Sequence, residues 1–96
     1  MKPRPYGAAD VAAKLKDFPG WSLQEGAIRR TYETGGWPAS MRLANAIGDL
    51  AEAANHHPDL LVTWGSLTVM LSSHDAGGIT DRDFNLARKI EDLASR

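Results

Sequence analysis

Hydrophobic residues recur along this chain with two different spacings. Three segments repeat them every three or four positions, as an amphipathic helix does, and four shorter segments alternate them with polar residues, as strands do. The helical spacing covers residues 8–17, 38–55 and about 80–94. The alternating spacing covers residues 21–23, 27–34, 60–64 and 66–73. The predicted order is therefore helix, strand, strand, helix, strand, strand, helix.

Short turns join the members of each strand pair. Gln24-Glu25-Gly26 separates the first two strands and Gly65 the last two, and connections this short join antiparallel neighbours. Two hairpins separated by a helix predict an α+β fold, a four-stranded antiparallel sheet with three helices packed on one face. The 96 residues form one domain. Residues 1–7, rich in proline and charge, are expected to be a loose lead-in.

Two residues near the start of the last helix depart from its pattern. Leu86 and Ile90 mark the apolar stripe, and at ~100° per residue Asp83 falls within the same sector. Thr80 and Asp83 have the spacing of a capping box, which is an ordinary reason for an acid here. A carboxylate directed inward still needs a partner, and a histidine would be one. Phe84 falls well off the stripe, so we expect it to meet another subunit or a neighbouring loop.

All three histidines lie in the second half of the chain. His56 and His57 stand where the long helix meets Pro58. Proline disfavours the helical conformation in the residue before it, so His57 should be turned out of the helix. His74 ends the last predicted strand, just before a glycine-rich loop. Glu52 precedes His56 by four residues, so the two side chains can meet on one side of the helix, although spacing alone favours a solvated Glu52.

Composition narrows the possible chemistry. The chain has no cysteine, which excludes disulfides, thiolate catalysis and cysteine metal ligands. Its net charge of -1 provides no general attraction to nucleic acid or to an anionic membrane. No apolar run approaches the ~20 residues of a membrane span, and no signal-peptide pattern is present. A cytoplasmic protein is the expectation.

Three interpretations of the histidines remain open at this point. Three imidazoles and a water can bind zinc, but adjacent histidines rarely chelate one ion, so a metal site is the least favoured. Imidazoles titrate near neutral pH and can act as general acid and general base, the two roles that a dehydration needs. The third interpretation is an interaction module whose histidines only cap and pack.

The spacing of these residues resembles a known signature. Glu52-x3-His56-His57-Pro58, followed by Trp64, His74 and Asp83, resembles the signature of the pterin-4a-carbinolamine dehydratases. Flanking agreement comes from residues 71–74, 77–80 and 83–87 and from Pro19-Gly20-Trp21. The resemblance covers about residues 8–94. The fold of this family, a four-stranded antiparallel sheet with three helices on one face, matches the order of helices and strands predicted from the hydrophobic spacing.

The resemblance implies a reaction and a set of site residues. Members dehydrate 4a-hydroxytetrahydrobiopterin (pterin-4a-carbinolamine) to quinonoid dihydropterin, which supports tetrahydrobiopterin recycling, and they need no metal or organic cofactor. By position, the implied catalytic residues are His56, His57, His74 and Asp83. His56 and His74 would be the acid–base pair, and His57 would bind and orient the pterin. The implied substrate-binding residues are Glu52, His57, Pro58, Trp64 and Ser73.

The chain also departs from the family pattern. The aromatic residue that commonly follows the His-His-Pro corner is Leu60 or Leu61 here, and the aromatic-Asn pair at the end of that strand is Trp64-Gly65. These differences concern the pterin pocket more than the reaction. The resemblance further implies a homodimer or homotetramer whose partner is a small pterin. The alternatives are a related pterin, or a non-catalytic binding, assembly or dimerisation module on the same fold.

Overall fold

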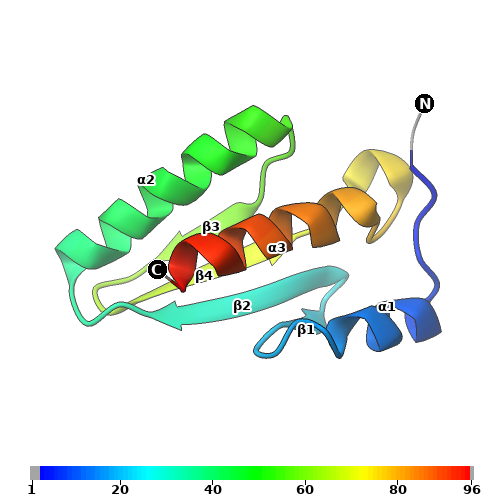
Figure 1. Ribbon diagram of the computed structural model, residues 1–96, viewed down its shortest axis with the longest axis horizontal. Helices are drawn as coiled ribbons and strands as arrows, with labels where there is room; N and C mark the ends of the chain where they lie inside the picture. The colour runs from blue at the N-terminus through cyan, green and yellow to red at the C-terminus, as the bar shows by residue number, and fades with distance from the viewer. Residues whose placement is uncertain (1–2, 96) are drawn as a thin grey trace.

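The predicted order of elements is confirmed by the computed structural model, which describes residues 3–95 (Figure 1). The elements are α1 (Ala8–Leu15), β1 (Ser22–Gln24), β2 (Ala27–Glu33), α2 (Trp37–Ala54), β3 (Asp59–Val62), β4 (Ser66–Leu71), a short 3-10 helix η1 (His74–Ala76) and α3 (Asp81–Ala94). Element boundaries lie within about two residues of the predicted ones, as is usual at element ends. His74 is the exception that matters, because β4 ends at Leu71 and His74 begins η1.

The four strands form one antiparallel sheet in the order β1-β2-β4-β3. Each hairpin contributes one central strand, and β2 pairs with β4 so that Ile28 lies opposite Leu71. Strand β3 pairs with the other side of β4, with Leu60 opposite Val69. Because neighbours across strands share a face, these apolar residues all point to the side that the helices cover. The predicted α+β class is confirmed.

The core lies between this face of the sheet and helices α2 and α3; in Figure 1, α3 passes in front of the sheet and α2 runs beside β3. Its fully buried large apolar side chains come from both layers: Ile28, Leu67, Val69 and Leu71 from the sheet, Ile47 from α2, and Leu86 and Ile90 from α3. Burying a side chain of this size contributes about 1.5–3 kcal/mol. The helices and the sheet therefore stabilise each other by burying apolar side chains between them.

A single carboxylate, that of Glu91, joins the sheet region to the C-terminal half of α3. Glu91 Oε1 accepts hydrogen bonds from Trp21 Nε1 at 2.8 Å and from the Tyr32 hydroxyl at 2.6 Å. Arg30 Nε lies 3.4 Å from the same oxygen. This ion pair explains why Arg30 faces inward beside Ile28. Burial and the bond to Glu91 together raise the pKa of Tyr32 above its ordinary value.

The N-terminal segment is better anchored than the sequence indicated. Residues 1 and 2 of the expected loose lead-in lie outside the described residues, but the Tyr6 amide donates to Ile79 O at 2.8 Å. The Tyr6 hydroxyl donates to the Asp81 carboxylate, and this bond raises the pKa of Tyr6 to about 12. Phe84 is buried, with its ring 5.6 Å from that of Tyr6 and 5.3 Å from that of Phe18. Of the two contacts predicted for Phe84, the one with a neighbouring segment is found.

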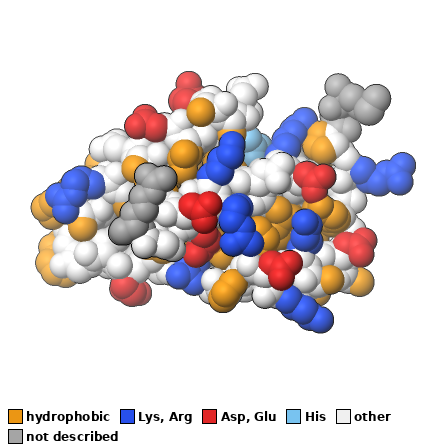
Figure 2. Space-filling view, in the orientation of Figure 1, with side chains coloured by type: hydrophobic (Ala, Val, Ile, Leu, Met, Phe, Trp, Pro, Cys, Tyr) orange, Lys and Arg blue, Asp and Glu red, His pale blue; other side chains and the backbone are white. Residues whose placement is uncertain are grey.

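The helix-bearing side of the molecule carries charges of both signs, interspersed with small apolar areas (Figure 2). No helix within residues 3–95 has the length and apolar character needed to cross a membrane. Large apolar side chains that remain exposed are Leu23, Trp37, Met41, Leu61 and Trp64.

Candidate active site

Helix α2 ends because Asn55 takes a left-handed conformation, with φ of 50°. Asparagine is one of the few residues other than glycine that adopts this conformation readily. The Asn55 amide donates to Glu52 O at 3.1 Å and the His56 amide to Ala51 O at 3.1 Å, which satisfies the last carbonyls of the helix. The chain therefore turns at Asn55, two residues earlier than the proline rule placed the turn.

This early turn changes which histidine meets which acid. Helical spacing allows Glu52 to meet His56, four residues on, but favours a solvated Glu52, and in the structure Glu52 is exposed and does not contact His56. His57 Nε2 lies 2.5 Å from Glu52 Oε1 instead, because the helical spacing no longer applies beyond Asn55. His56 points the other way, and its Nε2 lies 2.6 Å from Asp83 Oδ1.

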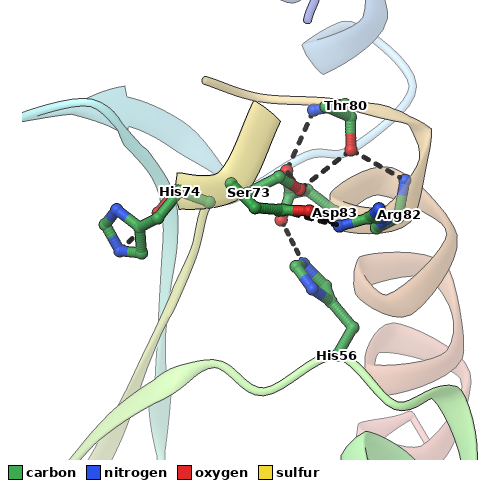
Figure 3. A network of polar contacts seen from close by, with 8 residues as sticks. His56, Ser73, His74, Thr80, Arg82 and Asp83 are labelled. Atoms are coloured by element: carbon green, nitrogen blue, oxygen red, sulfur yellow. Dashed lines mark hydrogen bonds and ion pairs between the residues drawn. The ribbon is translucent and has the colours of Figure 1, made fainter. Parts of the chain in front are cut away.

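Asp83 is fully buried, at 0% exposure, in the first turn of α3. Its Oδ2 accepts hydrogen bonds from the Thr80 amide and from the Ser73 hydroxyl, each at 2.9 Å (Figure 3). The capping box predicted from Thr80 and Asp83 is present. The inward carboxylate also has the histidine partner that its position on the helix required, and that histidine is His56.

The direction of each hydrogen bond follows from the chemistry of this carboxylate. An ionised carboxylate only accepts hydrogen bonds, so the His56 Nε2 and the Ser73 hydroxyl must both donate to it. Having used its hydrogen, Ser73 Oγ accepts from Thr80 Oγ1 at 2.9 Å. Thr80 Oγ1 in turn accepts from the Arg82 amide at 3.2 Å. In the neutral His56 ring the hydrogen is therefore on Nε2, and Nδ1 has the free lone pair.

A surface hollow of about 640 Å³ brings the three histidines together. Its walls are residues 54–57 at the end of α2, residues 72–75 after β4, and Arg82. The side chain of His56 is 11% exposed, whereas His57 stands at an open rim with a side-chain exposure of 57%, and its partner Glu52 is 79% exposed. Three imidazoles thus line one hollow.

His74 occupies the far wall without a link to the Asp83 network. Its Nε2 lies 3.3 Å from Ser72 Oγ, and Figure 3 shows its ring directed away from Asp83. The turn that carries it is closed by paired backbone bonds between Ser73 and Gly78, at 2.9 and 3.2 Å. His74 is exposed on a short, closed turn, so its imidazole can reach a ligand in the hollow from the side opposite His56.

Arg82 is a site residue that the sequence analysis missed. It lines the hollow, and its Nη1 lies 2.9 and 3.0 Å from the two carboxylate oxygens of Asp75. Its place directly before Asp83, in the capped first turn of α3, was the available signal. The contact with Asp75 depends on η1, which no sequence pattern indicated.

Two of the residues expected to bind substrate are placed differently from the expectation. Trp64 follows β3, which runs away from the histidine corner, and six residues of extended chain span ~20 Å. Its carbonyl accepts from Ser40 Oγ at 3.3 Å, near the opposite end of α2, and its side chain is 69% exposed. One copy of the chain therefore does not bring Trp64 to the histidines.

Ser73 lies at the hollow, but its hydroxyl is buried against Asp83 and Thr80. Pro58 holds the corner between His57 and β3.

Residues 3–95 contain no group of three or more His, Asp and Glu side chains placed to hold one metal ion. The donors that do converge, an imidazole and a carboxylate at 2.6 Å, are engaged with each other. Such a pair is the arrangement in which a carboxylate orients a histidine for proton transfer.

Residues 4–93 match the family model described as pterin 4 alpha carbinolamine dehydratase. The chain belongs to this family. A protein of Thermomicrobium roseum, provisionally named pterin-4-alpha-carbinolamine dehydratase, is 42% identical over 87 residues, which cover 91% of this chain and 94% of the relative.

Two solved structures are also similar to this pterin-4a-carbinolamine dehydratase family member. A transcriptional coactivator/pterin dehydratase from Brucella melitensis superposes with a TM-score of 0.88, covers 95% of this chain and 99% of its own, and is 22% identical. A pterin dehydratase-like protein identified as a RuBisCO assembly factor in the alpha-carboxysome has a TM-score of 0.60 and 17% identity, covering 77% and 86%. At these identities the likeness concerns the fold alone.

Proposed function

We propose that this protein dehydrates 4a-hydroxytetrahydrobiopterin to quinonoid dihydropterin by histidine acid–base catalysis. The observation that carries the proposal is the hollow lined by His57, His74 and His56, the last of which is oriented by the buried Asp83. Membership of the family and a 42% identical relative provisionally named for this reaction support the same conclusion.

The reaction requires two proton transfers. The C4a–O bond breaks as the hydroxyl leaves as water, which needs an acid, and the N5–H proton is lost as the C4a=N5 bond forms, which needs a base. His56 is suited to be the base, because Asp83 holds the hydrogen of Nε2 and leaves the Nδ1 lone pair free. The negative Asp83 also stabilises the imidazolium that forms when Nδ1 takes the proton. His74, on the opposite wall, is the matching acid.

The remaining residues hold the substrate or the catalytic groups. His57, at the rim with Glu52, orients the pterin ring, and Pro58 keeps His57 at that corner. Ser73 and Thr80 act through Asp83, because their hydroxyls form a chain that ends on its carboxylate. In this assignment Ser73 is a positioning residue, and Trp64 has no contact with the pterin within the same copy.

The proposal includes the setting in which the enzyme works. The product is the form that a reductase returns to tetrahydropterin, so the protein supports recycling of the pterin cofactor of aromatic amino-acid hydroxylases, in the cytoplasm. We further propose a homodimer or homotetramer. The large apolar side chains left exposed on one copy, Trp37, Met41 and Trp64 among them, are suited to such contacts.

The test is turnover of freshly generated 4a-hydroxytetrahydropterin by the purified protein. We expect a rate well above the spontaneous one, and a fall of about 10²- to 10⁴-fold in His56→Ala and in His74→Ala. Lys89→Ala, at an exposed position of α3, is the control and should retain the full rate.

A wild-type rate equal to the spontaneous one would overturn the proposal. Pterin binding without turnover would then favour a non-catalytic module on this fold. Turnover restricted to another 4a-hydroxypterin would instead identify a related substrate.

A further inference from the structure

A second hollow, of about 480 Å³, lies on the side of the sheet that no helix covers. It is lined by the β1–β2 hairpin at residues 24–27, by the strand residues Arg29, Asp59, Met70 and Ser72, and by His74, Gly77 and Gly78. Its volume is in the range of small-molecule pockets. Of the residues that line it, His74 alone has a role in the proposed reaction.

The floor of this hollow follows from the strand register. Arg29 lies opposite Met70, and Met70 lies opposite Asp59 on its other side. Cross-strand partners share a face, so these three side chains form one row across β2, β4 and β3. The row places an apolar thioether in the centre, a cation on one side and a carboxylate on the other.

Arg29 has unused capacity to bind an anion. Its Nη1 lies 3.4 Å from Gln24 Oε1 and its Nη2 lies 3.4 Å from Met70 Sδ. The contact with Gln24 is long for an N–H···O hydrogen bond, the thioether sulfur of Met70 is a weak acceptor, and a guanidinium has five N–H donors. None of the ion pairs within residues 3–95 includes Arg29. A carboxylate or phosphate in the hollow would supply the fork-shaped partner that arginine prefers.

The two hollows adjoin, because Ser72 and His74 line both of them. Met70 is two residues from Ser72 along β4, and Arg29 is one strand further across. At ~3.3 Å per residue and ~4.8 Å between strands, Arg29 is therefore about 8 Å from Ser72 along the sheet. A ligand whose ring lies among the histidines can pass His74 and reach Arg29 with a substituent of that length.

We infer that the second hollow is a subsite for the ring substituent of the pterin, and that it selects substituents ending in an anionic group bound by Arg29. This inference rests on the proposed function. Met70 contacts the middle of the substituent, and Asp59, on the opposite side of Met70, repels the anion towards Arg29. The subsite thus accepts the neutral side chain of biopterin and gives tighter binding to pterins whose side chain ends in a carboxylate or phosphate.

The test is calorimetric binding of three stable pterins to the whole chain. 7,8-Dihydrobiopterin has a neutral side chain, 7,8-dihydrofolate ends in carboxylates, and 7,8-dihydroneopterin monophosphate ends in phosphate. We expect at least one anionic pterin to bind about 10-fold or more tightly than dihydrobiopterin, as a charge-assisted contact provides. Arg29→Gln should abolish this difference and leave dihydrobiopterin binding unchanged, whereas Arg42→Gln, an exposed arginine of α2 outside both hollows, should preserve it.

Each outcome decides the inference. Tighter binding of the folate alone or of the phosphate alone supports it and identifies the anion. Dihydrobiopterin binding with no preference for either anion, or a preference that survives Arg29→Gln, overturns the subsite and leaves the proposed function standing. Failure of all three pterins to bind overturns both. Dihydrobiopterin binding also reports whether the site is folded, so its loss in Arg29→Gln would show that this variant is unfolded. Arg29→Lys, which keeps a point charge but loses the fork-shaped donor group, is then the variant to measure. We expect it to show a reduced preference for the anionic pterin, and an undiminished preference would contradict the inference.

Discussion

Replacing Asp83 by asparagine alters the donor–acceptor order of the site while keeping its size. The amide carries no charge and has one acceptor oxygen and two donor hydrogens. The Thr80 backbone N–H cannot turn round, so the amide oxygen should keep the side that faces Thr80 and Ser73. The NH₂ group then faces His56 Nε2, which must become an acceptor. His56 is expected to change tautomer, with its hydrogen moving to Nδ1.

The size of the expected loss of folding stability follows from three hydrogen bonds to the fully buried carboxylate of Asp83. A bond to a charged group contributes about 1.5–3 kcal/mol and a neutral one about 0.5–1.5 kcal/mol, so each loses about 1 kcal/mol. The smaller desolvation of an amide offsets part of this loss. We expect Asp83→Asn to lower the free energy of unfolding by about 1–3 kcal/mol, and the urea midpoint by about 1–2 M. The wrong tautomer of a catalytic histidine lowers turnover by about 10⁴-fold in a Ser-His-Asp triad, which sets the upper limit for the dehydration.

Three measurements check this prediction: urea unfolding followed by tryptophan fluorescence, the tautomer of His56 from imidazole ¹⁵N shifts, and the dehydration rate. Asp92→Asn, at an exposed acid of the same helix, is the matched control and should behave as wild type. The reasoning fails if Asp83→Asn unfolds at the same urea concentration as Asp92→Asn and His56 still carries its hydrogen on Nε2.

Three further predictions concern the turn after α1, the alkaline limit of stability and the rim of the site. Gly20→Ala should lower the free energy of unfolding by about 1–2 kcal/mol, because φ is +90° and a Cβ would lie 1.2 Å from Arg30 Nη1. Gly48→Ala, in open space within α2, should raise the free energy of unfolding by about 0.5–1 kcal/mol. Equal urea midpoints for the two variants would contradict both predictions. Folding raises the pKa of Tyr32 above its ordinary 10.0, so its neutral phenol stabilises the fold fully below pH 10 and this contribution is lost as the pH rises further. In the wild type the urea midpoint should therefore fall with increasing pH above about pH 10, and Tyr32→Phe should make this fall smaller. An equal dependence on pH in the two proteins would refute the prediction. His57→Gln should raise KM more than it lowers kcat, because His57 stands at the exposed rim; steady-state kinetics with the reverse pattern would assign it to catalysis instead.

The order of elements could be read from the sequence because each helix and strand has its own apolar period, and that period sets which face meets the core. The inward position of Asp83 was also readable, since it depends only on the turn of a regular helix. Its partner was not, because the choice among three histidines depends on how α2 packs beside α3. Helical spacing brought Glu52 within reach of His56, but the left-handed Asn55 ends that spacing, and Glu52 contacts His57.

Two other features depended on strand geometry rather than on residue type. The extended run from Pro58 to Trp64 carries the tryptophan away from the corner, so a motif that is continuous in sequence is divided in space. The row of Arg29, Met70 and Asp59 joins three strands, and it exists only in one register of the sheet. Alternation along each strand predicted the exposed face but not the neighbours on it.

The double attachment of Asp83 bears on how descendants of this chain could lose their reaction. One carboxylate oxygen caps α3 and the other holds His56, so the acid is needed for folding even where no catalysis takes place. A lineage that adopts this fold as a scaffold is expected to keep Asp83 and to lose His74, because His74 is exposed and its ring contacts Ser72 Oγ only at 3.3 Å. If the proposed function holds, we expect the exposed histidine to distinguish an enzyme from a scaffold within this fold, and the buried acid to be kept in both.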